Sequence, residues 1–331
     1  MGKLNLTLAC GLYDRTQALM DGTVKPEGVS LNFIPLMPGE TFWRMLNNSE
    51  FDVSEMSLSS YTILRSRGDD RFIAIPVFPS RIFRHSGIYI NNGSGISSAA
   101  DLKGKTIGVG DYQMTAAVWA RGLLQDEYQV RPSDMKWVVG EAVQKVALPE
   151  NISITRADKE SPEQLLETGK IDALISVMIP SALNSSSSNV VRLFPDYRKV
   201  EQDYFRRTGI FPIMHTVVIR KEIYEDYPWL TISLYKAFKE AKQLSYRRLM
   251  NTDALNTILP WSVSEMEETR EIMGEDYWDY SIEGSRPTLD ALTRYLYEQS
   301  LTDIKMNPDD LFVNNINEGL DKYLHGTSED R

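Results

Sequence analysis

Short apolar runs alternate with amphipathic stretches in the first eighty residues. Apolar and β-branched residues predict strands at 4–9, 29–34 and 72–77. Between these runs, apolar residues recur at helical spacing in 41–46 and 58–65, which predicts two helices. The order strand, helix, strand, helix, strand is typical of an α/β unit on a parallel or mixed sheet.

A second unit of the same kind follows the Gly-rich stretch at 91–95. Strands are predicted at 106–109, 135–139 and 171–176, with a helix at 113–126 between the first two. Ser161 and Pro162 are residue types that favour an N-cap and a first helical position, and Gly169 is typical of the end of that helix. The serine-rich residues 181–189 predict a surface loop.

Two segments of the chain each combine arginines and a histidine with a predicted strand. FPSRIFRHSGIY at 78–89 leads into an apolar run at 88–90, and FRRTGIFPIMHTVVIR at 205–220 contains a predicted strand at 216–219. Two similar crossings indicate one domain inserted into another. We therefore predict one lobe from residues 1–87 and 216–331 and an inserted lobe from residues 88–215. Helices predicted at 228–250 and 286–296 give the first lobe a helical C-terminal extension, followed by a disordered tail from residue 327.

The composition is that of a globular protein with room for two domains. The chain has 331 residues, of which 42% are hydrophobic and 25% charged. A net charge of −10 argues against broad binding to nucleic acid or anionic membranes. The single cysteine, Cys10, excludes an intrachain disulfide framework, and no Cys/His cluster has zinc-site spacing. The N-terminus lacks the features of a secretory signal, so we expect a soluble, cytoplasmic protein.

Several motifs that would define a catalytic class are missing from the sequence. It contains no GxGxxG or GxxxxGK[ST] phosphate loop and no GxSxG elbow, which argues against nucleotide-dependent and elbow-type hydrolase chemistry. The close spacing of Arg81, Arg84 and His85 indicates instead a negatively charged small molecule. Arginine presents a fork of donors that matches a carboxylate, and histidine transfers protons near neutral pH.

Longer motifs in the sequence resemble a known fold and a known family. The YDRT turn, VKPEGVSLNFIPL, ADLKGKTIGVGDY and GKIDALIS resemble the type II periplasmic-binding-protein fold. Within that fold, FPSRIFRH, GDYQMTAAVWARG, TGIFPIMHTVVIR and LPW resemble the 4,5-dihydroxyphthalate decarboxylase family over nearly the whole chain. The resemblance implies an α/β fold of two lobes, each a mixed, mostly parallel sheet flanked by helices, with the ligand cleft between the lobes.

The resemblance also implies a function. Members of the family convert 4,5-dihydroxyphthalate to protocatechuate and CO2 without oxidation, and no organic cofactor is expected. The expected partner is a small aromatic dicarboxylate, with no nucleic acid and no membrane, and we expect a homo-oligomer. The alternative is a solute-binding receptor that captures an aromatic or dicarboxylic acid for a transporter, because one fold hosts both functions.

Such a decarboxylation makes three demands on the cleft. Direct loss of CO2 would leave an aryl carbanion in the ring plane, so a route that first protonates the carboxylate-bearing carbon is favoured. An ionised para hydroxyl drives electron density to that carbon. The cleft therefore needs cationic clamps for the carboxylates, a proton donor over the ring face and an acceptor for the phenol proton.

The resemblance and the strand ends select candidates for each role. The carboxylate clamps are expected to be Arg81 and Arg84, then Arg207 and Arg15, and the proton donor His85 or His215. The proton acceptor is expected to be Glu55 or Asp14, with Asp111 as a further carboxylate that would serve equally well as a helix cap. Polar contacts to substrate are expected from Ser57, Asp111, Tyr112, Gln113, Thr115 and Ser176, and ring stacking from Tyr13, Phe83, Trp43 or Trp261. Each histidine could instead be an ordinary core residue, and His325, near the tail, serves as a negative control.

A divalent metal is the main mechanistic alternative. Glu55, His85 and His215 could form a set of two histidines and one carboxylate that holds an ion against the catechol or carboxylate of the substrate. No local spacing in the sequence demands this arrangement, so the first expectation is that no metal is bound.

Overall fold

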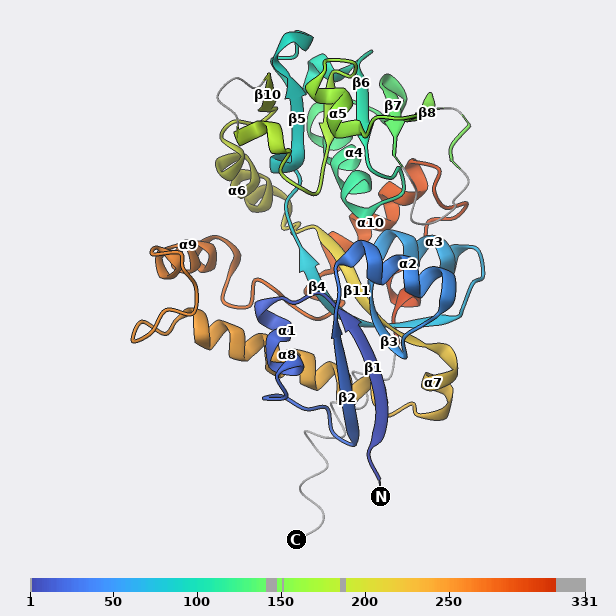
Figure 1. Ribbon diagram of the computed structural model, residues 1–331, viewed down its shortest axis with the longest axis vertical. Coiled ribbons are helices and arrows are strands. Elements are labelled where there is room, and N and C mark those ends of the chain that lie inside the picture. Colours follow the sequence, from blue (N-terminus) through green and yellow to red (C-terminus); the bar gives the residue numbers. More distant parts are fainter. Residues whose placement is uncertain (1, 141–147, 151, 185–188, 314–331) are drawn as a thin grey trace.

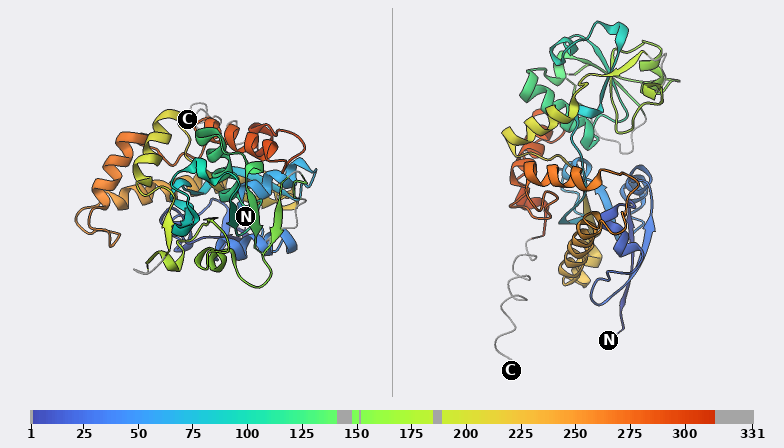
Figure 2. Two further views of the ribbon diagram at one scale, coloured as in Figure 1. Left: turned by 90° about the horizontal axis from the view of Figure 1, so that it is seen from above. Right: turned by 90° about the vertical axis from the view of Figure 1, so that its left-hand side faces the viewer.

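The computed structural model describes residues 2–140, 148–150, 152–184 and 189–313 and contains two mixed sheets stacked along the long axis (Figures 1 and 2). The first sheet has the order β2-β1-β3-β11-β4 and the second β10-β5-β9-β6-β7-β8. The first consists of β1 (Leu4–Cys10), β2 (Val29–Pro35), β3 (Val53–Ser57), β4 (Phe72–Arg81) and β11 (Ile213–Arg220). The second consists of β5 (Ile88–Asn91), β6 (Thr106–Val109), β7 (Lys136–Val139), β8 (Ile154–Arg156), β9 (Ala173–Ile175) and β10 (Val190–Arg192).

Helices cover both sheets and extend from the first. They are α1 (Asp14–Met20), α2 (Pro38–Asn48), α3 (Leu58–Ser66), α4 (Thr115–Tyr128), α5 (Pro162–Glu167), α6 (Tyr197–Thr208), α7 (Lys221–Asp226), α8 (Leu230–Leu249), α9 (Ser262–Met273) and α10 (Arg286–Glu298). None of the helices in the described ranges has both the length and the apolar content needed to cross a bilayer.

The strand pairing confirms a mixed, two-lobed α/β architecture. In the first sheet β1 is parallel to β2 and β3, whereas β11 is antiparallel to both β3 and β4. In the second sheet β6, β7, β8 and β9 are parallel, and β5 is antiparallel to β9 and β10. The chain leaves the first sheet after Arg81, enters the second at Ile88, and returns at Ile213. The predicted inserted lobe, residues 88–215, therefore includes the first three residues of β11, which belong to the first sheet.

Three strands were missed from the sequence: β8 and β10 in the second sheet, and the central strand β3 in the first. All five residues of β3, VSEMS, are buried, although three of them are polar. Neither alternation nor an apolar run marks such a segment. A buried polar strand is costly unless its side chains find partners, and it therefore draws attention to Glu55 and Ser57.

The C-terminal helix α10 packs against both lobes. It contacts α3 in the first lobe and α4 in the second, between which it lies in Figure 1. The Tyr295 hydroxyl donates a hydrogen bond to Asp126 of α4 over 2.6 Å. The Tyr295 ring lies against the backbone of α4 at Gly122, where a Cβ atom would overlap the ring. Glycine is thus required for the close approach of the two helices.

We predict that Gly122→Ala lowers the free energy of unfolding by about 1–3 kcal/mol, because the added methyl overpacks a buried interface. In a helix with free space the same change is usually stabilising, by roughly 0.5–1 kcal/mol. Gly39→Ala in α2 is the matched control, since no atom lies within 4 Å of the position of its Cβ. Urea unfolding of both variants measures the difference, and equal stabilities would contradict the close packing.

Candidate active site

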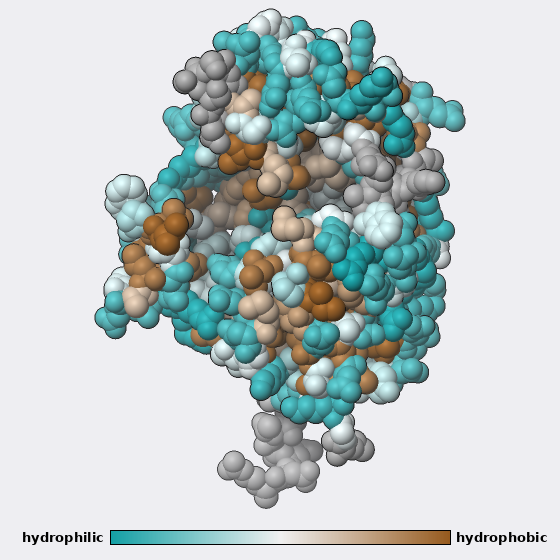
Figure 3. Space-filling view, in the orientation of Figure 1, coloured by the Kyte–Doolittle hydropathy of each residue, from teal (hydrophilic) through white to brown (hydrophobic). Residues whose placement is uncertain are grey.

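A cavity of about 840 Å³ lies between the two lobes. Figure 3 shows the hollow that separates the upper and lower parts of the molecule, with apolar side chains at its edges. Residues at or next to the starts of α2, α3 and α4 line it, including Pro38, Ser60 and Thr115. The first turn of a helix leaves N–H groups without intrahelical partners, so such an arrangement favours an anionic ligand.

One wall of the cavity carries a histidine backed by a buried carboxylate. His215 lies on β11 opposite Ser57 of β3, which places it diagonally beside Glu55. His215 Nδ1 lies 2.6 Å from Glu55 Oε1, and the Phe42 ring packs edge-on against the imidazole with centroids 4.8 Å apart. His215 lines the cavity, whereas the Glu55 side chain is completely buried behind it.

Glu55 is held by donors from the end of β1 as well. The Tyr13 hydroxyl donates to Oε1 over 2.8 Å and the Gly11 amide donates to Oε2 over 2.8 Å. Burial alone would raise the pKa of Glu55. The opposing charge and hydrogen bond of His215, helped by Gly11 and Tyr13, outweigh it and leave the pKa lowered. An ionised carboxylate only accepts hydrogen bonds, so the Nδ1 atom of His215 carries a proton and Nε2 is the ring nitrogen left for other partners.

Arg84 supplies a cation to the same cavity. Its Nε and Nη2 atoms donate to the Met214 sulfur over 3.2 and 2.8 Å, a weak acceptor for a charged group. No carboxylate lies within ion-pair distance of Arg84 in the part of the chain that the structure describes. Burial, opposed by Glu201, lowers the pKa of Arg84 to about 10, so the side chain stays cationic at neutral pH. A buried guanidinium paired only with sulfur is well suited to receive an anion.

Hydroxyl groups from both lobes meet on the cavity wall. Ser57 Oγ lies 2.9 Å from Thr115 Oγ1, and Ser59 Oγ lies 3.0 Å from the same atom. Asp111, at the turn before α4, also lines the cavity, and its Oδ2 atom accepts a hydrogen bond from Gln113 over 2.7 Å. The cavity therefore combines a cation, an imidazole, hydroxyls and a carboxylate.

Comparison with curated proteins gives two relatives with the same name. A 4,5-dihydroxyphthalate decarboxylase of Comamonas testosteroni is 38% identical over 320 residues, which cover 94% of this chain and 97% of the relative. A second, from Pseudomonas putida, is 40% identical over 214 residues, or 62% of this chain and 83% of the relative. The chain belongs to the 4,5-dihydroxyphthalate decarboxylase family. It is therefore a carboxy-lyase, as the sequence motifs predicted.

More distant matches agree with the fold. The family described as "ABC transporter, phosphonate, periplasmic substrate-binding protein" matches residues 13–152. The periplasmic aliphatic sulphonate binding protein SsuA from Escherichia coli aligns with a TM-score of 0.53 at 13% identity over 96% of this chain and 99% of that protein. A mutant of the desulfurization enzyme DSZB in complex with biphenyl-2-sulfinic acid aligns with a TM-score of 0.51 at 13% identity over 97% and 99% of the two chains. At this identity the likeness concerns the fold alone and does not favour the receptor alternative.

Within this decarboxylase-family fold, seven of the predicted residues lie in or behind the cavity. Arg84, His215, Ser57, Asp111 and Thr115 line it, and Glu55 supports His215 from behind. Tyr13, predicted to stack on substrate, also lines it and contacts Glu55. Gln113 is buried beside Asp111, and Ser176 directly precedes the lining residues Val177 and Met178.

The structure corrects the expected role of three arginines. Arg81 is buried and donates to Phe211 O, Asp279 O and Ser285 Oγ, so its guanidinium links elements of the first lobe. Arg207 lies on the exposed face of α6 and pairs with Glu127. Arg15 donates to Pro79 O over 2.6 Å and pairs with the exposed Asp14, and neither residue lines the cavity.

The structure also corrects the expectations for the remaining candidates. Tyr112 is buried against Trp137 and Arg121, away from the cavity lining. Phe83 stacks on Phe211, and Trp43 and Trp261 are exposed outside the cavity lining. His325 lies outside the described residues, as does the predicted tail from residue 327.

His85 is a core residue rather than a proton donor. It is 1% exposed, with its ring centroid 5.4 Å from Phe194 and 5.3 Å from Tyr204. Burial, followed by the charge of Arg207, lowers the pKa of His85 to about 4, so the ring is neutral at pH 7. The predicted metal set of Glu55, His85 and His215 is also not assembled: in the described ranges no three His, Cys, Asp or Glu side chains could hold a metal ion together.

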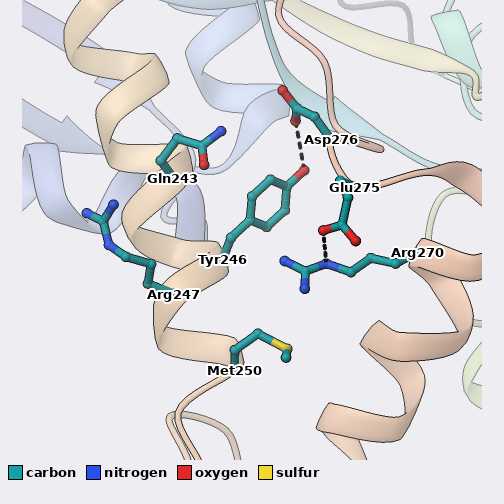
Figure 4. A pocket seen from close by; sticks show the side chains of 7 residues that line it. All are labelled: Gln243, Tyr246, Arg247, Met250, Arg270, Glu275 and Asp276. Carbon is teal, nitrogen blue, oxygen red and sulfur yellow. Dashed lines mark hydrogen bonds and ion pairs between the residues drawn. The ribbon is translucent and has the colours of Figure 1, made fainter.

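A second, smaller pocket does not share these properties. It has a volume of about 310 Å³ and lies between α8 and the segment that follows α9. Figure 4 shows Arg270 directed at Glu275 and Tyr246 hydrogen-bonded to Asp276. Because two carboxylates, Glu275 and Asp276, line this pocket, it is a weaker candidate for an anion than the cavity between the lobes.

Several contributors to the site were missed from the sequence, among them Phe42 and Ser60, which line the cavity. Met214 supplies the sulfur that contacts Arg84, and the Gly11 amide holds Glu55. A methionine beside a histidine carries no signal of such a role. Gly11, directly after a strand and two residues before Tyr13, could have been recognised as a turn where backbone and ring come close.

We predict that His85 makes the stability of the protein depend on pH. Its pKa in the folded protein, about 4, lies below the ordinary value of 6.5, so the unfolded chain takes up this proton first. The associated stability is present above pH 6.5 and is lost as the pH falls towards 4, a change of about 3 kcal/mol. In His85→Phe, which keeps an aromatic ring, this contribution is absent. Chemical unfolding at pH 7, 5.5 and 4 checks it, and parallel pH dependences in the two proteins would refute the assignment.

Proposed function

We propose that the cavity between the lobes decarboxylates 4,5-dihydroxyphthalate to protocatechuate and CO2. One observation carries the proposal: Arg84 and His215 line the same cavity. Arg84 is a buried cation without a carboxylate partner in the described chain, and His215 is an imidazole backed by a buried carboxylate. The names of the two relatives support this substrate.

Arg84 and the start of α4 are suited to bind the two carboxylates. Arg84 presents donors from the crossing between the lobes, and Thr115 and Ala116, the first two residues of α4, line the cavity. A charge-assisted hydrogen bond is worth roughly 1.5–3 kcal/mol. Ser57, Ser60 and Thr115 add hydroxyl groups that can contact the ring hydroxyls or carboxylates. Together these groups fix the ring against His215.

His215 is the proton donor in this proposal. The proton on Nδ1 stays on the imidazole, hydrogen-bonded to the ionised Glu55. The proton that moves is the one on Nε2 of the imidazolium, which passes to the carbon that bears the leaving carboxylate. The buried negative charge of Glu55 stabilises the imidazolium before transfer and orients the ring. Glu55 therefore acts through His215 and does not meet the substrate.

Asp111 is the proposed acceptor for the para-hydroxyl proton. As Asp111 takes this proton, the oxygen electrons enter the ring while the ring carbon receives the proton from His215, giving a dienone. The C–C bond to the carboxylate then breaks, CO2 leaves, and the bond electrons restore the aromatic ring. The hydroxyl oxygen recovers its proton from Asp111, and His215 is reprotonated from solvent. The net change is uptake of one proton and release of one CO2.

The proposal uses no organic cofactor and no metal ion, and the absence of both stays a prediction. The expected homo-oligomer and cytoplasmic location also stay predictions from the sequence.

The direct test is incubation of the purified protein with 4,5-dihydroxyphthalate. We expect release of one CO2 for each protocatechuate formed, with protocatechuate measured by chromatography. The rate after treatment with EDTA should equal the rate without it. Binding of the acid without product would refute the proposed substrate, and loss of activity in EDTA that returns with a divalent ion would refute the metal-free chemistry.

We predict that substitutions of two cavity residues change different kinetic parameters. His215→Asn removes the proton donor and should lower kcat by roughly 100-fold or more with little change in KM. Arg84→Met removes the carboxylate contact and should raise KM by about 10- to 100-fold. Arg206→Met, an exposed arginine paired with Asp203, is the matched control and should retain normal kinetics. Steady-state kinetics at pH 7 separates the cases, and a normal kcat in His215→Asn would rule out its role.

A further inference from the structure

Arg15 is held between two aromatic rings beside the active site. Its guanidinium carbon lies 4.3 Å from the centroid of Tyr13 and 4.1 Å from that of Trp278. Nε donates to Pro79 O over 2.6 Å and Nη1 contacts Asp14 over 3.0 Å. Neither Arg15 nor Trp278 lines the cavity. The arginine is therefore committed to this stack and does not face the substrate site.

Trp278 is the fixed end of the stack. Its indole N–H donates to Phe78 O over 2.8 Å, and its amide donates to the Tyr246 hydroxyl over 3.0 Å. Its carbonyl accepts a hydrogen bond from the ammonium of Lys242, a residue 1% exposed, over 2.9 Å. The Phe211 ring packs edge-on against the indole at 5.4 Å. With all of these contacts the indole has little freedom to move.

Tyr13 is the other end of the stack and reaches the catalytic pair. Its hydroxyl donates to Glu55 Oε1, the same oxygen that lies 2.6 Å from His215 Nδ1. The ring folds back over Gly11, where a Cβ atom would lie 2.6 Å from a ring carbon. Burial, then the charge of Glu55, raises the pKa of Tyr13, so the hydroxyl remains protonated and donates. The position of this ring thus sets the position of Glu55 Oε1.

We propose that Arg15 and Trp278 are positioning residues of the active site, which hold Glu55 and His215 in their working orientation through the ring of Tyr13. The inference rests on the proposed roles of His215 and Glu55. Each cation–π contact stabilises the stack, and a displacement of a catalytic group by about 1 Å can cost 100-fold in rate. Arg15 therefore affects turnover without contacting the substrate.

Steady-state kinetics of Arg15→Met and Arg15→Lys tests the proposal. Arg15→Met removes the cation and should lower kcat by about 10- to 100-fold, with KM within about threefold of the wild type. Arg15→Lys keeps a cation over the rings and should recover part of the loss. Arg206→Met should leave both parameters unchanged. A large rise in KM at normal kcat would overturn the proposal, because it would make Arg15 a carboxylate clamp.

The pH profile of kcat/KM gives a second readout. Tyr13→Phe removes one of the donors that lower the pKa of Glu55, so this pKa rises in the variant. Ionised Glu55 is the active form, and the acid limb should move to higher pH. An acid limb that stays in place in Tyr13→Phe would overturn the coupling of Tyr13 to Glu55.

Histidine NMR separates this inference from the choice of substrate, because it needs no turnover. The chain has three histidines, so the His215 ring signals can be assigned with His215→Asn. We expect these signals to shift in Tyr13→Phe and Arg15→Met while those of His85 stay in place. Unchanged His215 signals in both folded variants would overturn the positioning role. Shifted signals in a protein that releases no CO2 from 4,5-dihydroxyphthalate would overturn the proposed substrate and leave the positioning role supported.

Discussion

The burial of a carboxylate at the centre of the first sheet is the constraint on which the site depends. Taking an isolated carboxylate out of water costs several kcal/mol, so Glu55 can occupy β3 only with donors on both oxygens. His215, Tyr13 and Gly11 provide them from β11 and from the turn after β1. The strand order β1-β3-β11 brings these segments together although they lie far apart in the sequence.

The second feature of the site is a contrast among its arginines. Arg81, Arg15 and Arg207 each donate to carbonyls, hydroxyls or carboxylates. Arg84 has only the soft sulfur of Met214 in the described chain, although it is as buried as Arg81. Of these four arginines, the one with the weakest hydrogen-bond acceptor is thus the one that lines the cavity. A dianionic substrate would complete its coordination at the same time as it enters the reach of His215.

The sequence predicted most of the fold because both lobes follow local rules. Periodicity located all the strands of the first sheet except β3, whose buried polar residues break every simple pattern. Capping residues located α5, with Ser161 as its N-cap. The longer motifs identified the family, because they come from both lobes. The orientation of side chains could not be predicted in the same way: Arg81 and Arg84 are three residues apart, yet only Arg84 lines the cavity. His85 and His215 sit in similar motifs, but one is enclosed by aromatic rings and the other faces the cavity.

Helix α10 has a consequence for how the two lobes move. Besides the two chain crossings, it forms a third connection through Tyr295 to α4 and through its contacts with α3. A hinge that bends only at the crossings would have to pull the Tyr295 ring away from the backbone at Gly122 and separate Arg294 from Asp126. The width of the gap between the lobes is thus braced from the side by this helix. A ligand that enters this cavity would accordingly meet walls whose separation α10 has already set.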